Sequence, residues 1–190
     1  ADGSANVTAS NAVLGDAQGF SGDFGISSNP ESLAVDSYRI YFTDKQRNKV
    51  LRLSQDGLTP ISDVGMVSYF RDNLDATQFL IGSFDEIKGE YNLSLVRKVG
   101  SSLSNITVSF NEKTKGWSSF KSFVPETGLS INDEYLTGKT IYDAATYVNN
   151  HKLIWSHHNE DTVKAVDGTT SLEVEANNFY GTHYNSTVDV

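Results

Sequence analysis

Apolar and polar side chains alternate through much of this chain, most clearly over residues 38–62, YRIYFTDKQRNKVLRLSQDGLTPIS. A period of two is typical of half-buried β-strands. The stretch therefore predicts strands over residues 38–43 and 49–54, with the polar turn DKQRNK between them. Ile40 and Phe42 are expected to share one face. The same alternation predicts further antiparallel strands, each with one face in water, over residues 91–95, 106–110 and 172–176.

One spacing pattern, here called the frame, occurs three times: an Asp or Asn precedes a large apolar residue by six positions. The pairs are Asp44 with Val50, Asp85 with Tyr91, and Asn111 with Trp117. Asx side chains favour turn starts because they hydrogen-bond the backbone just ahead. The frame predicts hairpins over residues 38–54, 79–97 and 104–123, with turns near Asp44–Lys49, Asp85–Gly89 and Asn111–Gly116. Its separations of 41 and 26 residues correspond to one blade and part of a blade in repeat architectures of about 40–50 residues, although any antiparallel meander reuses Asx turns.

Two segments have helical spacing instead, and both predict short helices inserted between strands. The first has apolar residues at Met66, Tyr69, Phe70 and Leu74, behind a predicted N-cap region at Ser62-Asp63. The second has them at Ile141, Ala144, Ala145 and Val148, behind Thr140.

These patterns predict a mainly β protein, an antiparallel meander of hairpins in propeller-like blades with one or two short helices. Residues 1–30 are expected to form a loop-rich arm or edge segment. Residues 31–190 are expected to form a β-rich domain that is part of a larger protein, since both ends of the chain resemble truncation points. The large apolar residues expected in the core are Phe42, Leu51, Leu53, Phe84, Tyr91, Leu93, Leu95, Val108, Phe110, Trp117, Phe120 and Trp155.

The composition excludes several classes of function. The chain has 190 residues, a formal net charge of −9 and no cysteine. A sequence-independent nucleic-acid binder or a protein of anionic membranes needs a basic surplus, which is missing here. Disulfides and thiolate chemistry are excluded, and no apolar run approaches the length of a membrane span. The N-x-S/T sequons at Asn6, Asn92, Asn105 and Asn185 are expected by chance in so Asn- and Ser-rich a chain.

No constellation in the sequence predicts catalysis. The histidines are His151, His157, His158 and His183, and their spacing fits no zinc frame. Ser21 lacks the G-x-S-x-G context of a nucleophile elbow. Sugar hydrolysis needs a pair of carboxylates. Several are available, but the sequence singles out no two of them: Glu112, Glu126, Asp133, Glu134 and Asp143. We therefore predict no catalytic, cofactor-binding or metal-ligating residue, and no cofactor.

Aromatic residues are the remaining candidates for ligand contact. Trp117, Trp155, Tyr180 and Tyr184 have rings large enough to stack on sugars. Aromatic side chains at strand ends more often fill the space between sheets, so packing is the stronger interpretation.

Two resemblances add to these patterns. IYFTD and VLRLSQDG, five residues apart, resemble the hairpin of YWTD- or NHL-type propeller blades. Over roughly residues 25–190, runs such as KGWSSFKSFVPETGLSIN and NNFYGTHYNSTVDV resemble a tailed-phage virion protein of marine and crAss-like phages. The second resemblance implies a virion tail component, of the propeller-like nozzle or muzzle type that closes the DNA channel.

The favoured hypothesis is therefore a non-enzymatic virion structural protein. It would be assembled in the host cytoplasm as a homo-oligomer with other tail proteins, and DNA would at most pass through its channel. An extracellular glycan-binding propeller or adhesin is the first alternative, and a carbohydrate hydrolase the second. Exposed tryptophans on a concave face would favour the adhesin, and two carboxylates in a cleft the hydrolase.

Overall fold

The computed structural model describes residues 19–20, 22–99, 102–121, 123–142, 150–158, 177–179 and 182–184. Its helical elements are η1 (Pro30–Ser32), η2 (Ile61–Asp63) and α1 (Val67–Leu74). The first strands are β1 (Ala34–Asp36), β2 (Arg39–Asp44), β3 (Lys49–Ser54), β4 (Gly57–Pro60), β5 (Thr77–Asp85), β6 (Glu90–Val99) and β7 (Ser102–Asn111). The others are β8 (Gly116–Lys121), β9 (Thr127–Ile131), β10 (Glu134–Tyr142), β11 (Asn150–Ser156), β12 (Asn177–Phe179) and β13 (Thr182–Tyr184).

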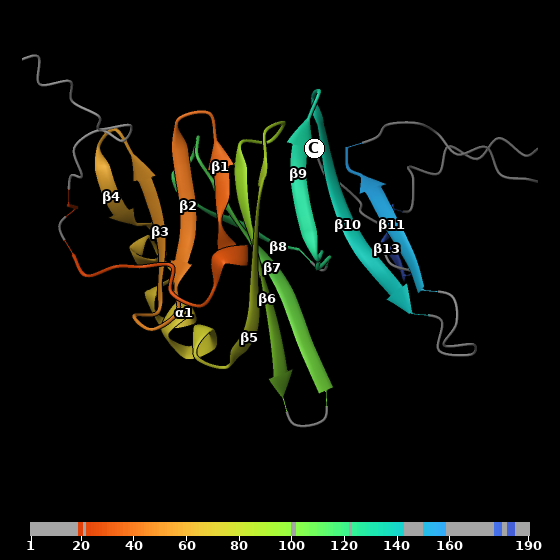
Figure 1. Cartoon of the computed structure of the whole chain (residues 1–190), viewed down its shortest axis with the longest axis horizontal. Coiled ribbons are helices and arrows are strands. Elements are labelled where there is room, and N and C mark those ends of the chain that lie inside the picture. Colours follow the sequence, from red (N-terminus) through yellow and green to blue (C-terminus); the bar gives the residue numbers. More distant parts are fainter. Residues whose placement is uncertain are drawn as a thin grey trace, which may run out of the picture.

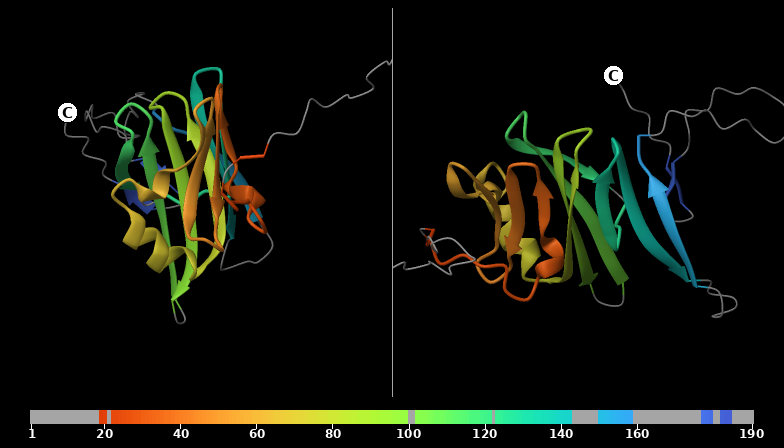
Figure 2. Two further views of the ribbon diagram at one scale, coloured as in Figure 1. Left: turned by 90° about the vertical axis from the view of Figure 1, so that its left-hand side faces the viewer. Right: turned by 45° about the horizontal axis from the view of Figure 1, so that its top comes forward.

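The fold is mainly β and antiparallel, as the alternation predicts. Strands β1 to β4 form a meander in chain order, here named sheet A, and β5 to β8 form a second meander, sheet B. Strands β9 to β11 form the three-stranded sheet C, and β12 pairs with β13. Sheets A, B and C follow one another across the molecule (Figure 1). Neighbouring sheets stack face to face, which the turned views also show (Figure 2).

Small residues let the first strands of neighbouring sheets approach closely. A Cβ atom added to Gly82 of β5 would lie 2.1 Å from the backbone oxygen of Ser32, just before β1. A Cβ atom added to Gly128 of β9 would lie 2.8 Å from the Cβ of Ser83 in β5. A glycine inside a strand often marks such a close approach of two backbones. The same device therefore joins sheet A to sheet B and sheet B to sheet C.

All three predicted hairpins are present within the described residues. They are β2–β3, β5–β6 and β7–β8, and each pair is antiparallel. Their Asx residues act as predicted: Asp44 accepts a hydrogen bond from the Arg47 amide, Asp85 from those of Ile87 and Lys88, and Asn111 from those of Lys113 and Thr114.

The spacing of this frame does not, however, measure a repeat. The three hairpins hold different places in their sheets, because β2–β3 is the middle hairpin of sheet A whereas β5–β6 opens sheet B and β7–β8 closes it. Any hairpin in a meander can begin with an Asx turn. The element that recurs is the whole sheet, which starts at Ala34, Thr77 and Thr127.

The core between sheets A and B is partly as predicted. Phe84, Tyr91, Leu93, Leu95, Val108 and Phe110 are buried in it. Leu51 is buried as well, but it pairs with Phe42 and therefore lies on the other face of sheet A. Phe42, Leu53, Trp117 and Trp155 are half-buried. Phe120 is 56% exposed, so its assignment to the core was wrong. In β2 the fully buried aromatic is Tyr41 rather than Phe42, because the odd-numbered residues of this strand face sheet B and Ile40 and Phe42 face away.

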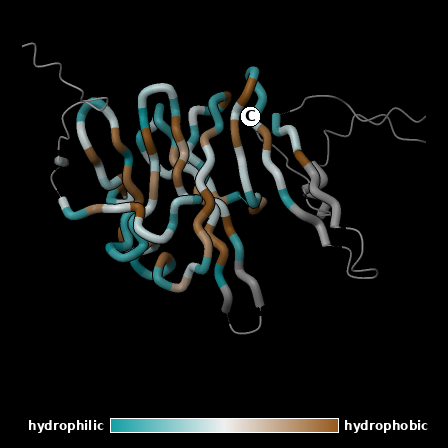
Figure 3. Tube along the Cα trace, viewed as in Figure 1, coloured by the Kyte–Doolittle hydropathy of each residue, from teal (hydrophilic) through white to brown (hydrophobic). Residues whose placement is uncertain are grey.

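Residues 91–95 of strand β6 also depart from the prediction, because neither face of the strand is wet there. Its residues 91–95 are all buried, including Asn92 and Ser94. The apolar stretches lie mainly on the strands (Figure 3). The polar residues between them in β6 are covered by sheet C.

One of the two predicted helices is present. Helix α1 buries Phe70 and Leu74, but its N-cap is Met66, and Ser62-Asp63 belongs to η2. The second prediction fails at its start, because Thr140 and Ile141 belong to strand β10 and pair with β11. Ala144, Ala145 and Val148 lie outside the described residues, as does the strand predicted over 172–176. Among the described residues, no helix is long and apolar enough to span a bilayer.

Candidate functional site

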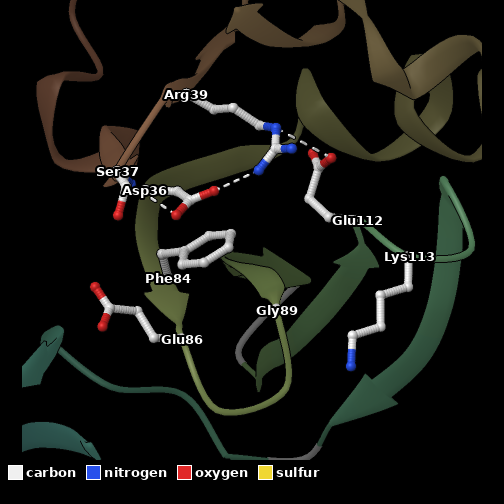
Figure 4. Close-up of a pocket in the computed structure, with 8 residues that line it drawn as sticks. All are labelled: Asp36, Ser37, Arg39, Phe84, Glu86, Gly89, Glu112 and Lys113. Carbon is white, nitrogen blue, oxygen red and sulfur yellow. Dashed lines mark hydrogen bonds and ion pairs between the residues drawn. The ribbon is translucent and has the colours of Figure 1, made fainter.

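A polar pocket of about 440 Å³ opens where three hairpin turns meet at one end of sheets A and B. The turns are β1–β2, β5–β6 and β7–β8. The lining residues are Asp36, Ser37, Arg39, Phe84, Glu86, Gly89, Glu112 and Lys113. Figure 4 shows the Arg39 side chain reaching toward both Asp36 and Glu112. The pocket wall thus contains three carboxylates and two cations.

Ion pairs and one hydroxyl engage the carboxylates of Asp36 and Glu112. Arg39 Nη1 lies 2.6 Å from Asp36 Oδ2, and Arg39 Nε lies 3.4 Å from Glu112 Oε2. Arg52 Nε lies 2.8 Å from the other oxygen of Glu112. The Tyr41 hydroxyl donates a 2.6 Å hydrogen bond to that same oxygen. Burial, and then this hydrogen bond to Glu112, raise the pKa of Tyr41.

This arrangement is suited to holding sheets together. Arg39, Tyr41 and Arg52 come from sheet A, whereas Glu112 follows the last residue of β7 in sheet B. Glycoside hydrolysis needs one carboxylic acid that donates a proton and a second carboxylate in another role. Here Asp36 and Glu112 share the same guanidinium. The geometry therefore supports a polar link between two sheets more directly than an acid–base pair.

The adjacent histidines have separate partners. His157 packs against Phe123 and Tyr135, and its Nε2 lies 2.8 Å from Thr137 Oγ1. Burial, together with the nearby His158, lowers the pKa of His157 to about 3. His158 Nε2 lies 2.7 Å from Asp85 Oδ2 and so links the end of sheet C to sheet B. Burial alone would raise the pKa of Asp85, but hydrogen bonds from His158 and Lys88 lower it.

The remaining candidates from the sequence are dispersed. Glu126, Asp133 and Glu134 are exposed in or beside sheet C, away from the pocket lining. Of the four candidate carboxylates that the structure describes, Glu112 alone lines the pocket. Within the described part of the chain, no three His, Asp or Glu side chains are grouped as a metal site. Of the sequons, Asn92 is buried and Asn105 is exposed. Ser21, Asp143, Tyr180, Asn6 and Asn185 lie outside the described residues, as do the side chains of His151, His183 and Tyr184.

Both tryptophans are half-buried and pack against neighbouring aromatic residues. Trp117 contacts Phe70 and Phe110, and its Nε1 donates a 3.0 Å hydrogen bond to the Ile61 oxygen. Trp155 packs on the cluster formed by Phe123 and Tyr135. The two indole rings thus fill space within and between sheets, in agreement with the packing interpretation.

Sequence reasoning missed the partners of Glu112. Arg39 and Arg52 alternate with apolar residues in predicted half-buried strands, a pattern that by itself indicates side chains facing solvent. Tyr41 lies on the same face as Arg39, two positions along β2. A signal was available, because an Arg can bury its aliphatic stem along an apolar surface and need not face solvent when it shares a strand face with a large aromatic.

Comparison with known proteins adds the family. Residues 1–141 match the family described as Crassvirus muzzle protein. The match includes residues before position 25, where the resemblance noted in the sequence begins. A search of curated proteins gave no match. Because the family match covers well over half of the 190 residues, the chain belongs to the Crassvirus muzzle protein family, a group of phage virion structural proteins.

Proposed function

We propose that this chain is a non-enzymatic structural component of the phage tail, where copies of it assemble with one another and with other virion tail proteins. The observation that carries the proposal is the family match over residues 1–141. The pocket supports it as well, since its ion pairs link sheet A to sheet B. Assembly requires extended surface rather than a reactive group.

The stack of sheets supports the muzzle, or nozzle, form of this role. Successive antiparallel meanders whose first strands are neighbours have the arrangement of propeller blades. Strands β1, β5 and β9 are the first strands here. On this interpretation the three sheets are consecutive propeller-like blades, and their first strands face a common axis. The arm of residues 1–30 and the β-rich domain of residues 31–190 would then be parts of a larger tail protein.

The charge of the chain fits a wall beside DNA. The sequence has 24 acidic and 15 basic side chains. An acidic wall repels phosphate, so DNA passes without being bound. The protein would act in the virion after assembly in the host cytoplasm, and DNA would be cargo in a channel rather than a ligand.

The test is to purify phage particles that encode this chain and measure its amount by quantitative mass spectrometry. We expect a fixed number of copies per particle through successive density gradients, and matching density at the tail in cryo-electron microscopy. A chain that is abundant in infected cells but absent from gradient-purified particles would refute the proposal.

Catalysis is tested separately on a panel of glycans. We expect the purified protein and its Glu112→Gln variant to be equally inactive. Turnover by the native chain that disappears in Glu112→Gln would contradict the non-enzymatic role, because Glu112 is the pocket carboxylate with the most contacts.

A further inference from the structure

The two ends of the sheet stack both present apolar side chains outward. On sheet A, one row of paired residues crosses all four strands, and we name it the A face: Val35, Ile40, Leu53 and Leu58. This row lies opposite Tyr41, which points into the core between sheets A and B. Val35 is 60% exposed. The A face is therefore an apolar stripe that no other described sheet covers.

Sheet C has a matching surface at the other end. We name it the C face, and it contains Leu129, Ile131, Leu136 and Ile154. These residues alternate with Gly128, Tyr135 and Thr137, which face sheet B. Ile154 is 77% exposed, and Leu129 and Ile131 are each about half exposed. Apolar residues grouped in this way on a soluble protein mark an interaction surface.

The arrangement inside the chain indicates what covers these faces. Sheets A and B stack with β1 beside β5, and sheets B and C stack with β5 beside β9. A glycine lies at each contact: Gly82 of β5 lies against the backbone just before β1, and Gly128 of β9 lies against β5. If a further sheet stacks on sheet C in the same way, the first strand of that sheet lies beside β9. The first strand of a second copy is β1, and the described part of its sheet turns the A face outward.

We propose that copies of this chain associate head to tail, with the C face of one copy packed on the A face of the next. One kind of contact then covers both apolar faces, whereas a twofold pairing of either face with itself leaves the other exposed. Repetition of a head-to-tail contact produces a ring when the rotation closes. The proposal specifies the surfaces for the self-assembly in the proposed tail function, on which it rests.

The chain is suited to a cross-linking test because it has no cysteine. Val35→Cys and Leu129→Cys each place one thiol on an exposed position, one on the A face and one on the C face. Under mild oxidation or with a short bis-maleimide linker, we expect covalent dimers when the two variants are mixed, and few when either is treated alone. The double variant should give a ladder of oligomers, because each copy then has both thiols.

Ser68→Cys is the matched control, since Ser68 is exposed on helix α1, outside both faces. Mixed with either variant, it should not cross-link. Light scattering gives a second readout: the native protein should increase in mass with concentration, and Ile154→Asp should remain monomeric with unchanged thermal stability. A monomer at every concentration, or cross-linking of Val35→Cys or Leu129→Cys alone as efficient as in the mixture, would overturn the proposal.

These outcomes are separate from those for the proposed function. Mixed cross-links in a protein that is absent from particles would refute the tail role and leave the head-to-tail contact standing. If the chain is present in particles but the two variants never cross-link, the tail role stands and the head-to-tail contact is refuted.

Discussion

Each face of sheet B packs against a neighbouring sheet, but the two interfaces are built from different chemistry. The face toward sheet A is apolar and aromatic, and Tyr41 of sheet A stacks on Phe84 and Tyr91 at ring distances of 5.4 and 4.8 Å. The buried centre of the face toward sheet C is polar: Ser83, Asn92, Ser94, Thr107 and Ser109. One sheet thus forms an apolar interface on one side and a hydrogen-bonded interface on the other.

The polar interface is buried because its groups satisfy one another. The Tyr135 hydroxyl of sheet C lies 2.7 Å from Ser83 Oγ and accepts a 3.2 Å hydrogen bond from Asn92. Ser109 donates to Asn92, and Thr107 donates to the Phe123 backbone oxygen. Buried polar groups are tolerated when each has a partner. When one partner is removed from such a network, the remaining groups stay buried without a hydrogen bond, and each then costs its full desolvation free energy.

The largest expected effect comes from neighbouring residues on opposite faces of β6. Leu93→Ala removes a fully buried side chain from the apolar interface and should lower the free energy of unfolding by about 2–5 kcal/mol. Ser94→Ala removes a hydroxyl that lies 2.6 Å from Thr107 Oγ1, and should cost about 1 kcal/mol. Urea unfolding of both variants measures the difference. Equal losses would mean that the two interfaces do not differ in kind.

The same strand explains how far sequence reasoning reached. Alternation in β6 predicts the strand and its apolar face, and Asx residues predict the turns, because both signals are local. The burial of Asn92 was not predicted, because a polar residue in an alternating strand indicates solvent unless a partner is known. That partner, Tyr135, is 43 residues away. Gly82 in IGSFD was a usable signal, since a glycine inside a strand indicates close approach of another backbone.

The candidate pocket was harder to anticipate than the fold. Glu112 was recognised as an available carboxylate, but its contacts with Arg39 and Arg52 span 73 and 60 positions respectively (112 − 39 and 112 − 52). These contacts depend on how two sheets stack, and no local pattern determines that. Family membership depends on residues along most of the chain, so it was reached by resemblance and not from any single motif.

The hydrogen-bonded interface should be sensitive to one oxygen atom. Tyr135→Phe keeps the ring but leaves Ser83 and Asn92 without their shared partner, which should cost about 1–3 kcal/mol. Tyr38→Phe is the matched control, because Tyr38 is 77% exposed. Thermal and urea unfolding should separate the two variants. An unchanged Tyr135→Phe protein would show that packing alone holds sheet C on sheet B.

Acid should weaken the sheet B–sheet C interface through His157. Its pKa is about 3 in the folded protein, below the ordinary value of 6.5, so the unfolded chain binds the proton first as the pH falls. Stability is therefore complete above pH 6.5 and decreases by about 1.4 kcal/mol per pH unit from this group as pH falls toward 3.

The variant His157→Gln isolates this contribution. Asp85 and Glu90 have pKa values lowered from 3.8 and 4.5, so their stabilising effect is lost only at lower pH. Between pH 6.5 and 4.5, the native protein should therefore lose stability more steeply than His157→Gln. Urea unfolding across this range gives the difference in slope, and parallel curves for the two proteins would contradict the assignment.

The smallest expected effect lies at the rim of the apolar interface, where Arg39 joins Asp36 and Glu112. The Arg39 side chain is 32% exposed, so water and salt screen its ion pairs, and such pairs contribute about 0–1 kcal/mol. Arg39→Met keeps the aliphatic contact and should cost no more than that in urea unfolding, with a difference from the native protein that shrinks at high salt. Arg71→Met, on the exposed surface of α1, is the control and should leave stability unchanged at either salt concentration. A salt-independent loss as large as that of Leu93→Ala would mean that Glu112 depends on Arg39 as a buried partner. The boundary between the apolar and hydrogen-bonded interfaces would then have to include the pocket.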